Sequence, residues 1–111
     1  MNKLHVLWTT GDKEVALNMI FMYVLNAKKN GWWKEVNLIV WGPSARLIAE
    51  EPVISGEIVE LIHAGIHIEA CKACADTYGV SSILSSMGID VKYMGVTLTE
   101  YLKSDEKLVT F

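Results

Sequence analysis

Short apolar runs alternate with longer amphipathic segments along the whole chain of 111 residues. The apolar runs have the length and the β-branched content of strands that are buried on both faces of a sheet. They predict five strands, namely Lys3–Thr9, Glu35–Trp41, a run from Ile66 that gives way to a helix at Cys71, Val91–Met94 and Lys107–Phe111.

The segments between these runs predict helices: Lys13–Lys29, Ser44–Glu50, Glu57–Ala64, a segment from Cys71, Ser81–Met87 and Thr99–Lys103. Asp12 and Ser44 are candidate N-caps, and Glu51-Pro52 is expected to separate two helices. Regular alternation of strands and helices predicts an α/β fold with a mainly parallel five-stranded sheet between layers of helices.

The segment Lys13–Lys29 is apolar around nearly its whole circumference. A helix of this kind is buried on more than the side that faces its sheet. In so small a domain we expect the extra apolar face, together with the neighbouring Trp32-Trp33 pair, to form an interface between copies of the chain.

Length and composition narrow the class of protein. A chain of 111 residues is expected to form a single domain over residues 1–111, and 51% apolar residues suffice for a core. The net charge of -3 argues against nucleic acid as a partner. The uncharged runs are too short for a membrane span or a signal peptide. Two cysteines are too few for a disulfide framework, so we expect a cytoplasmic protein.

Four predicted loops should gather at the carboxyl edge of the parallel sheet: Thr10–Asp12, Gly42–Ser44, Cys71–Cys74 and Gly95–Thr97. Such an edge is where parallel α/β proteins place their sites. By loop position alone, the residues that would shape a pocket there are Gly11, Asp12, Ser44, Gly95 and Thr97.

Cys71 is the main candidate for chemistry, because it lies where a strand becomes a helix. Unpaired N–H groups and the helix dipole at such a junction favour a thiolate over a thiol. The neighbouring Lys72 would favour the thiolate further, whereas Glu69 on the same strand face would oppose it. The alternative interpretation is a small buried residue with no reactivity.

Cys71 and Cys74 form a C-x-x-C sequence, which permits a disulfide at a helix start. No proline follows Cys74, so the cis-proline that faces the cysteines in thioredoxin-like enzymes has no counterpart. His63, His67 and the two cysteines superficially resemble a zinc set, but His67 and Cys71 would be roughly 13 Å apart along a strand. We therefore expect no metal site, and the sequence contains no phosphate-binding or dinucleotide motif that would indicate a cofactor.

Three segments resemble the DsrE/DsrF/TusD-like family. They are Ala70–Val80 with its Cys-(x)7-Gly-Val spacing, Met94–Glu100 and the ending Lys107–Phe111. The likeness extends over nearly the full length, including the first strand, the Gly11 turn and the long first helix. The resemblance implies a three-layer α/β/α fold and assembly into dimers, trimers or hexamers.

In the sulfur-relay members of that family, a cysteine at the position of Cys71 accepts sulfur as a persulfide and passes it to a partner protein. The resemblance therefore implies a sulfur carrier in which Cys71 is the persulfide site, with donor and acceptor proteins as partners. Cys74 has no counterpart in those relay members and is a possible resolving thiol. Two alternatives stay open: a non-catalytic subunit that binds a small ligand, and a dithiol oxidoreductase that uses Cys71 and Cys74.

Overall fold

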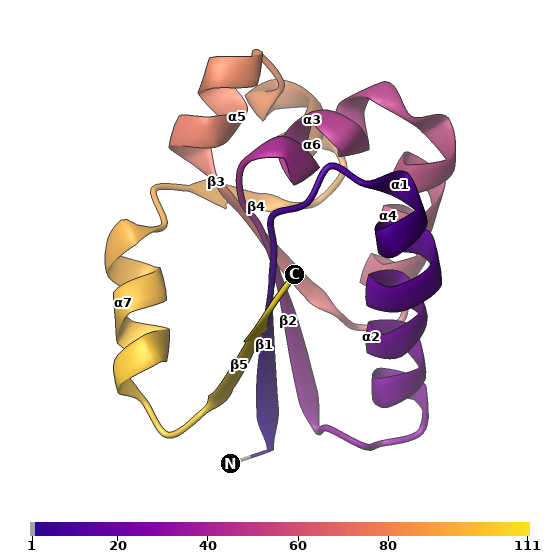
Figure 1. Cartoon of the computed structure of the whole chain (residues 1–111), viewed down its shortest axis with the longest axis vertical. Coiled ribbons are helices and arrows are strands. Elements are labelled where there is room, and N and C mark those ends of the chain that lie inside the picture. Colours follow the sequence, from indigo (N-terminus) through magenta and orange to yellow (C-terminus); the bar gives the residue numbers. More distant parts are fainter. Residues whose placement is uncertain (1) are drawn as a thin grey trace.

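The computed structural model describes residues 2–111, and its centre is a parallel sheet of five strands (Figure 1). The strands lie in the order β4-β3-β2-β1-β5. Their bounds are Lys3–Trp8 for β1, Glu35–Val40 for β2, His67–Cys71 for β3, Asp90–Lys92 for β4 and Lys107–Thr110 for β5. The parallel five-stranded sheet predicted from the apolar runs is confirmed.

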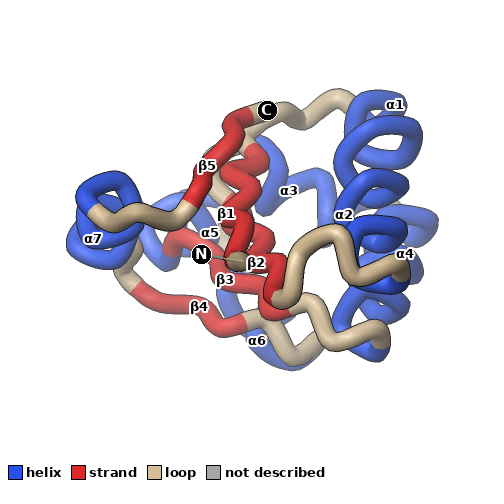
Figure 2. The backbone as a smooth tube through the Cα atoms, turned by 90° about the horizontal axis from the view of Figure 1, so that it is seen from below, coloured by secondary structure: helices blue, strands red, loops and turns tan. Residues whose placement is uncertain are grey.

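Helices cover both faces of the sheet unequally. Figures 1 and 2 show α2 and α4 on one face and α7 by itself on the other. The helical elements are α1 Lys13–Val15, the π-helical turn η1 Ala16–Ile20, α2 Phe21–Lys29, α3 Pro43–Glu50, α4 Pro52–His63, α5 Lys72–Tyr78, α6 Ser81–Ser86 and α7 Gly95–Lys103. The α1, η1 and α2 elements follow without a break, so the predicted helix over residues 13–29 is confirmed.

Successive side chains of each strand point to opposite faces of the sheet. Leu4, Val6 and Trp8 of β1 join the large core beneath α2 and α4, as do the equivalent residues of β2 and β3. The intervening residues face α7, and of these Leu7, Ile39 and Cys71 form a much smaller apolar cluster with Met94. Cys71 therefore lies on the thinly covered side of the sheet.

Two predicted boundaries are wrong at the end of the sheet and the start of α7. The strand expected over Val91–Met94 is Asp90–Lys92, and the helix expected from Thr99 begins at Gly95. Lys92 pairs with Cys71, the last residue of β3, so the ladder has no further partner. The chain turns at once, which leaves Tyr93 70% exposed.

Two expectations about helix starts are also wrong. The helix expected over Glu57–Ala64 begins five residues earlier, because Pro52 occupies the first turn, where its missing N–H costs nothing. Ser44 is not the N-cap of α3; that position belongs to Gly42, and the Ser44 hydroxyl donates instead to the Trp8 carbonyl at 2.7 Å. The Ser44 side chain thus ties α3 to the end of β1.

Candidate functional site

Cys71 ends β3 and is the N-cap residue of α5. The strand alternation turns its side chain away from the main core and toward α7. Its side chain is only 5% exposed. The strand-to-helix junction predicted from the sequence is therefore present, but the thiol lies below the surface.

Cys74 lies in the first turn of α5 and is half-buried beside Cys71. Burial raises the pKa of the Cys74 thiol, and a hydrogen bond with the Cys71 thiol adds to the rise. A hydrogen bond from the Gly42 backbone N–H to the Cys74 sulfur opposes it. The rise predominates, so Cys74 is a protonated thiol at neutral pH that contacts Cys71.

The two cysteines share an apolar environment with residues from three parts of the chain. Ile39 of β2 and Met94, the N-cap residue of α7, are buried against Cys71. Leu7, Trp41 and Tyr101 are partly buried around them. Such surroundings shield the Cys71 sulfur from water, whereas Cys74 is partly exposed.

Glu69 lies two residues before Cys71 on the same face of β3 and is 1% exposed. Its carboxylate accepts hydrogen bonds from Asn37 Nδ2 at 2.8 Å and from the Tyr101 hydroxyl at 2.7 Å, and Lys92 Nζ lies 2.7 Å away. Burial by itself would raise the pKa of Glu69, but these three partners outweigh it and lower the pKa below its ordinary value. Glu69 is therefore an ionised carboxylate with its charge fully partnered.

The hydrogen bonds continue from Glu69 across the sheet to β1. Asn37 donates to His5 Nδ1 at 3.0 Å, and His5 Nε2 lies 2.7 Å from Glu106. This arrangement requires His5 to accept at Nδ1 and to donate from Nε2, which is the neutral imidazole. His5 is fully buried, and the Tyr101 ring stacks on it at 3.8 Å between centroids.

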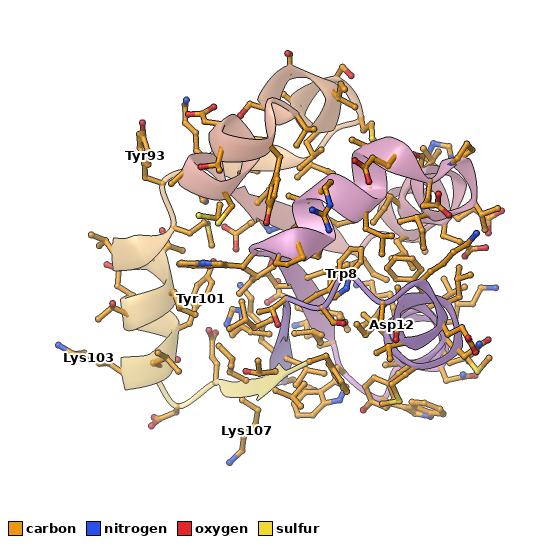
Figure 3. The ribbon with its side chains drawn as sticks, turned by 45° about the horizontal axis from the view of Figure 1, so that its top comes forward. Trp8, Asp12, Tyr93, Tyr101, Lys103 and Lys107 are labelled. Carbon is orange, nitrogen blue, oxygen red and sulfur yellow. The ribbon has the colours of Figure 1, made fainter. Side chains whose placement is uncertain are left out.

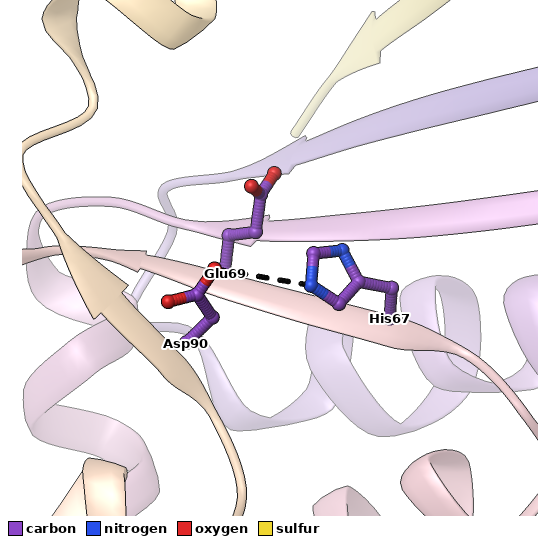
Figure 4. A group of neighbouring side chains, drawn as sticks. All are labelled: His67, Glu69 and Asp90. Atoms are coloured by element: carbon purple, nitrogen blue, oxygen red, sulfur yellow. Dashed lines mark ion pairs between the residues drawn. The ribbon is translucent and has the colours of Figure 1, made fainter.

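His67, Glu69 and Asp90 are the residues of the described chain that could hold a metal ion (Figure 4). One ligand atom from each lies within 4.8 Å of the others. Lys92 Nζ, however, lies 2.7 Å from Glu69 and 3.0 Å from Asp90. The lysine ammonium already provides the positive charge that this pair of carboxylates requires.

The zinc set considered from the sequence does not come together, because His67 and Cys71 occupy opposite ends of β3. His67 instead donates from Nδ1 to the side-chain oxygen Oδ1 of Asn37 at 3.0 Å.

Two of the predicted loops do meet at the carboxyl edge beside the cysteines. A Cβ atom at Gly11 would lie 3.2 Å from Pro43, so the loops after β1 and β2 are in contact. Asp12, however, uses its carboxylate to accept from the backbone N–H groups of Glu14 and Val15. It is the N-cap of α1, as predicted, and this bonding uses its oxygen Oδ1.

The other predicted binding residues are Ser44, Lys72, Gly95 and Thr97. Ser44 is buried with its hydroxyl bonded to the backbone, and Lys72 Nζ lies 2.8 Å from Asp76, one helical turn further along α5. Gly95 and Thr97 lie in the first turn of α7. Their role as pocket residues remains a prediction.

The sequence interpretation missed the polar network of His5, Asn37, Glu69, Lys92 and Tyr101. A signal was nonetheless present: His5, Asn37 and Glu69 each interrupt an otherwise apolar strand. The strand register pairs His5 with Asn37 and Glu69 with Ile39. Because Asn37 and Ile39 are two residues apart on β2, the side chains of His5, Asn37 and Glu69 all face α7. Polar residues that interrupt buried strands on one face indicate a partnered network.

None of the helices within residues 2–111 combines the length and the apolar character needed to cross a bilayer.

Among solved structures, the ychN protein from E. coli matches with a TM-score of 0.78 and 18% identity over 100% of both chains. This likeness concerns the fold alone and agrees with the three-layer α/β/α architecture expected from the sequence. No family model matches the chain. No curated protein matches it either.

A second solved structure is similar in sequence as well as in fold. It is that of BT1422 from Bacteroides thetaiotaomicron, described as a conserved protein of unknown function. The two chains are 48% identical over 99% of this chain and 95% of that one, with a TM-score of 0.97. The chain therefore belongs to the same family as BT1422 of Bacteroides thetaiotaomicron.

Proposed function

We propose that this protein is a DsrE-like sulfur carrier that holds a sulfane sulfur as a persulfide on Cys71. The observation behind the proposal is the position of Cys71, at the end of β3 and the start of α5, in an apolar cluster. The fold likeness to the ychN protein and the sequence resemblance of the cysteine segment support the same assignment. The donor is a persulfide, on a protein or a small molecule, and the acceptor is a thiol.

The transfer requires two thiol exchanges. In the first, the Cys71 thiolate attacks the terminal sulfur of a donor persulfide, a new S–S bond forms, and the donor leaves as a thiolate. Cys71 then carries –S–SH. In the second, an acceptor thiolate attacks that terminal sulfur and Cys71 leaves as a thiolate, so the protein returns to its first state without net oxidation.

The test is intact mass after incubation with a small-molecule persulfide donor. We expect a gain of about 32 Da, one sulfur atom, in the Cys74→Ser variant and no gain in Cys71→Ser. Serine is a good N-cap, so Cys71→Ser keeps the start of α5 intact. If Cys71→Ser gains sulfur as readily as the unmodified protein, the assignment of Cys71 is wrong.

The packing of Cys74 against Cys71 in one apolar cluster favours one second function, dithiol oxidation. A small disulfide would oxidise the pair: Cys71 and Cys74 join through one S–S bond, and the oxidant leaves as two thiols. The same mass experiment separates this case, because the unmodified protein would lose about 2 Da with glutathione disulfide and both serine variants would not. No mass change with either reagent would leave a ligand-binding subunit as the remaining interpretation.

A further inference from the structure

Helix α7 is attached to the sheet by very few side chains. Within this helix, which the structure describes completely, no residue is buried. Val96 is 75% exposed and Leu102 62% exposed, so the apolar residues of α7 partly face away from the protein. A helix held in this way opens at a lower free energy than the helices packed into the main core.

Two side chains anchor the middle and the end of this segment, and both contact His5. Tyr101 stacks its ring on His5 and donates its hydroxyl to Glu69 at 2.7 Å. Glu106, just beyond the helix, has its carboxylate 2.7 Å from Nε2 of the same imidazole. Figure 3 shows Tyr101 directed from α7 toward the sheet, whereas Tyr93 points away from the molecule.

The start of the same helix covers the candidate sulfur site. Met94, its N-cap residue, is 1% exposed and packs with Cys71 and Ile39. Tyr101 completes the partly buried rim of that cluster. Cys71 is 5% exposed, and Met94 and Tyr101 are two of the side chains packed around it.

We propose that α7 is a movable cover over Cys71 and that the Tyr101 hydroxyl, bonded to Glu69, is the latch that holds it closed. This inference rests on the proposed function for its purpose, because sulfur must enter and leave through the covered side. The buried Glu69 network thereby has a role: it keeps an ionised acceptor in place for the latch without exposing a charge. A donor or acceptor protein gains access by displacing α7, and a persulfide on Cys71 is sheltered from solvent between the two events.

The experiment measures how fast iodoacetamide alkylates Cys71 in the folded protein, by intact mass over time. Cys74→Ser is the common background, so Cys71 is the reporting thiol. Tyr101→Phe keeps the ring on His5 and removes the hydroxyl. A hydrogen bond to a charged acceptor changes the equilibrium between the closed and open positions of α7 by a factor of about ten or more. Without it the open form is more populated, so we expect alkylation of Cys71 to be faster by on the order of tenfold.

Tyr93→Phe is the matched control, because it removes a tyrosine hydroxyl from a side chain that is 70% exposed. It should react at the rate of the background protein. Equal rates in Tyr101→Phe and Tyr93→Phe would overturn the latch. A faster Tyr101→Phe rate counts in favour only if its thermal unfolding shows one cooperative transition.

Hydrogen exchange of the unmodified protein provides a second measurement that needs no variant. Backbone amides of α7 should exchange faster than those of α4, which contributes Ile54, Ile58 and Leu61 to the core. Equal protection of the two helices would contradict a movable cover. Neither measurement depends on sulfur loading, so failure of the carrier proposal and failure of the cover are told apart.

Discussion

At the scale of single residues, the main feature is one buried carboxylate, Glu69, with several polar partners. Glu69 is 1% exposed and is kept ionised by Lys92, Asn37 and Tyr101. An ionised group is costly to bury unless each partner is present. Its neighbour on the same strand face, Cys71, contacts apolar side chains and a second thiol instead. Two positions two residues apart thus have opposite environments.

The lowered pKa of Glu69 makes stability depend on pH. The folded protein holds the ionised form more strongly than the unfolded chain does, so the contribution is complete at neutral pH. It is lost as pH falls below the ordinary glutamate value of about 4.3 and through the lowered folded pKa. Acid should therefore weaken the fold, with Glu106, whose pKa His5 lowers, acting in the same direction.

Glu69→Gln should lower the free energy of unfolding at pH 7 by about 1–3 kcal/mol, because Lys92 loses a charged partner in a buried network. It should also flatten the decline in stability below about pH 4.3. Urea unfolding across this pH range measures both effects, with the exposed Glu60→Gln as control. If stability falls with pH in the same way in both variants, the ionised Glu69 is not the cause of the acid dependence.

At the scale of elements, the first helix begins at an N-cap, Asp12, which was also expected from the sequence to be a pocket residue. The Asp12 carboxylate accepts from Glu14 N at 2.9 Å and from Val15 N at 3.1 Å. These are donors that the first turn of a helix leaves unpaired. Asp12 adjoins the edge where the loops meet, and these two bonds cap the helix, while a part in ligand binding stays a prediction.

Asp12→Ala should destabilise the protein by about 1 kcal/mol through loss of the cap, and Asp12→Ser should restore most of that. Denaturation midpoints measure the difference. Asp105→Ala, a change of the same kind at an exposed loop residue, is the control. The cap assignment fails if the alanine variants at positions 12 and 105 have the same midpoint.

At the scale of the whole molecule, an apolar surface lies on the outside of the first helical segment. Met19, Met22 and Trp32 are 43%, 54% and 56% exposed, and with Tyr23 they line a hollow of about 260 Å³. Val109 of the edge strand β5 adjoins a second hollow that Met19 and Tyr23 also line. Exposed apolar surface grouped in this way is typical of a protein interface. A second copy of the chain is the occupant we expect.

Met22→Lys should shift the protein toward the monomer in sedimentation velocity at micromolar concentration, since it places a charge in the middle of this surface. Ile83→Lys changes a residue of α6 that is 47% exposed and lies outside the surface. It should leave the assembly unchanged. If the unmodified protein is a monomer at the same concentrations, the expected assembly through this surface is contradicted.

Agreement between sequence and structure is best where the signal is local. The positions of strands β1 and β2 and the uninterrupted helix over residues 13–29 are confirmed. Side-chain periodicity and local capping decide these elements. The prediction for β4 failed because its length depends on where β3 ends, which lies about twenty residues earlier. The start of α4 failed because Pro52 was taken to separate helices, whereas proline at a first helical turn is favourable.

The amino-acid pattern alone determines that this chain alternates strands and helices, that the sheet is parallel, and that a cysteine lies at a strand-to-helix junction. These properties follow from side-chain period, turn residues and chain order, all of which are short-range. The burial of Cys71 and the network around Glu69 follow instead from strand register and from the return of α7 across the sheet. Such contacts join residues about thirty or a hundred positions apart, because packing in three dimensions selects them.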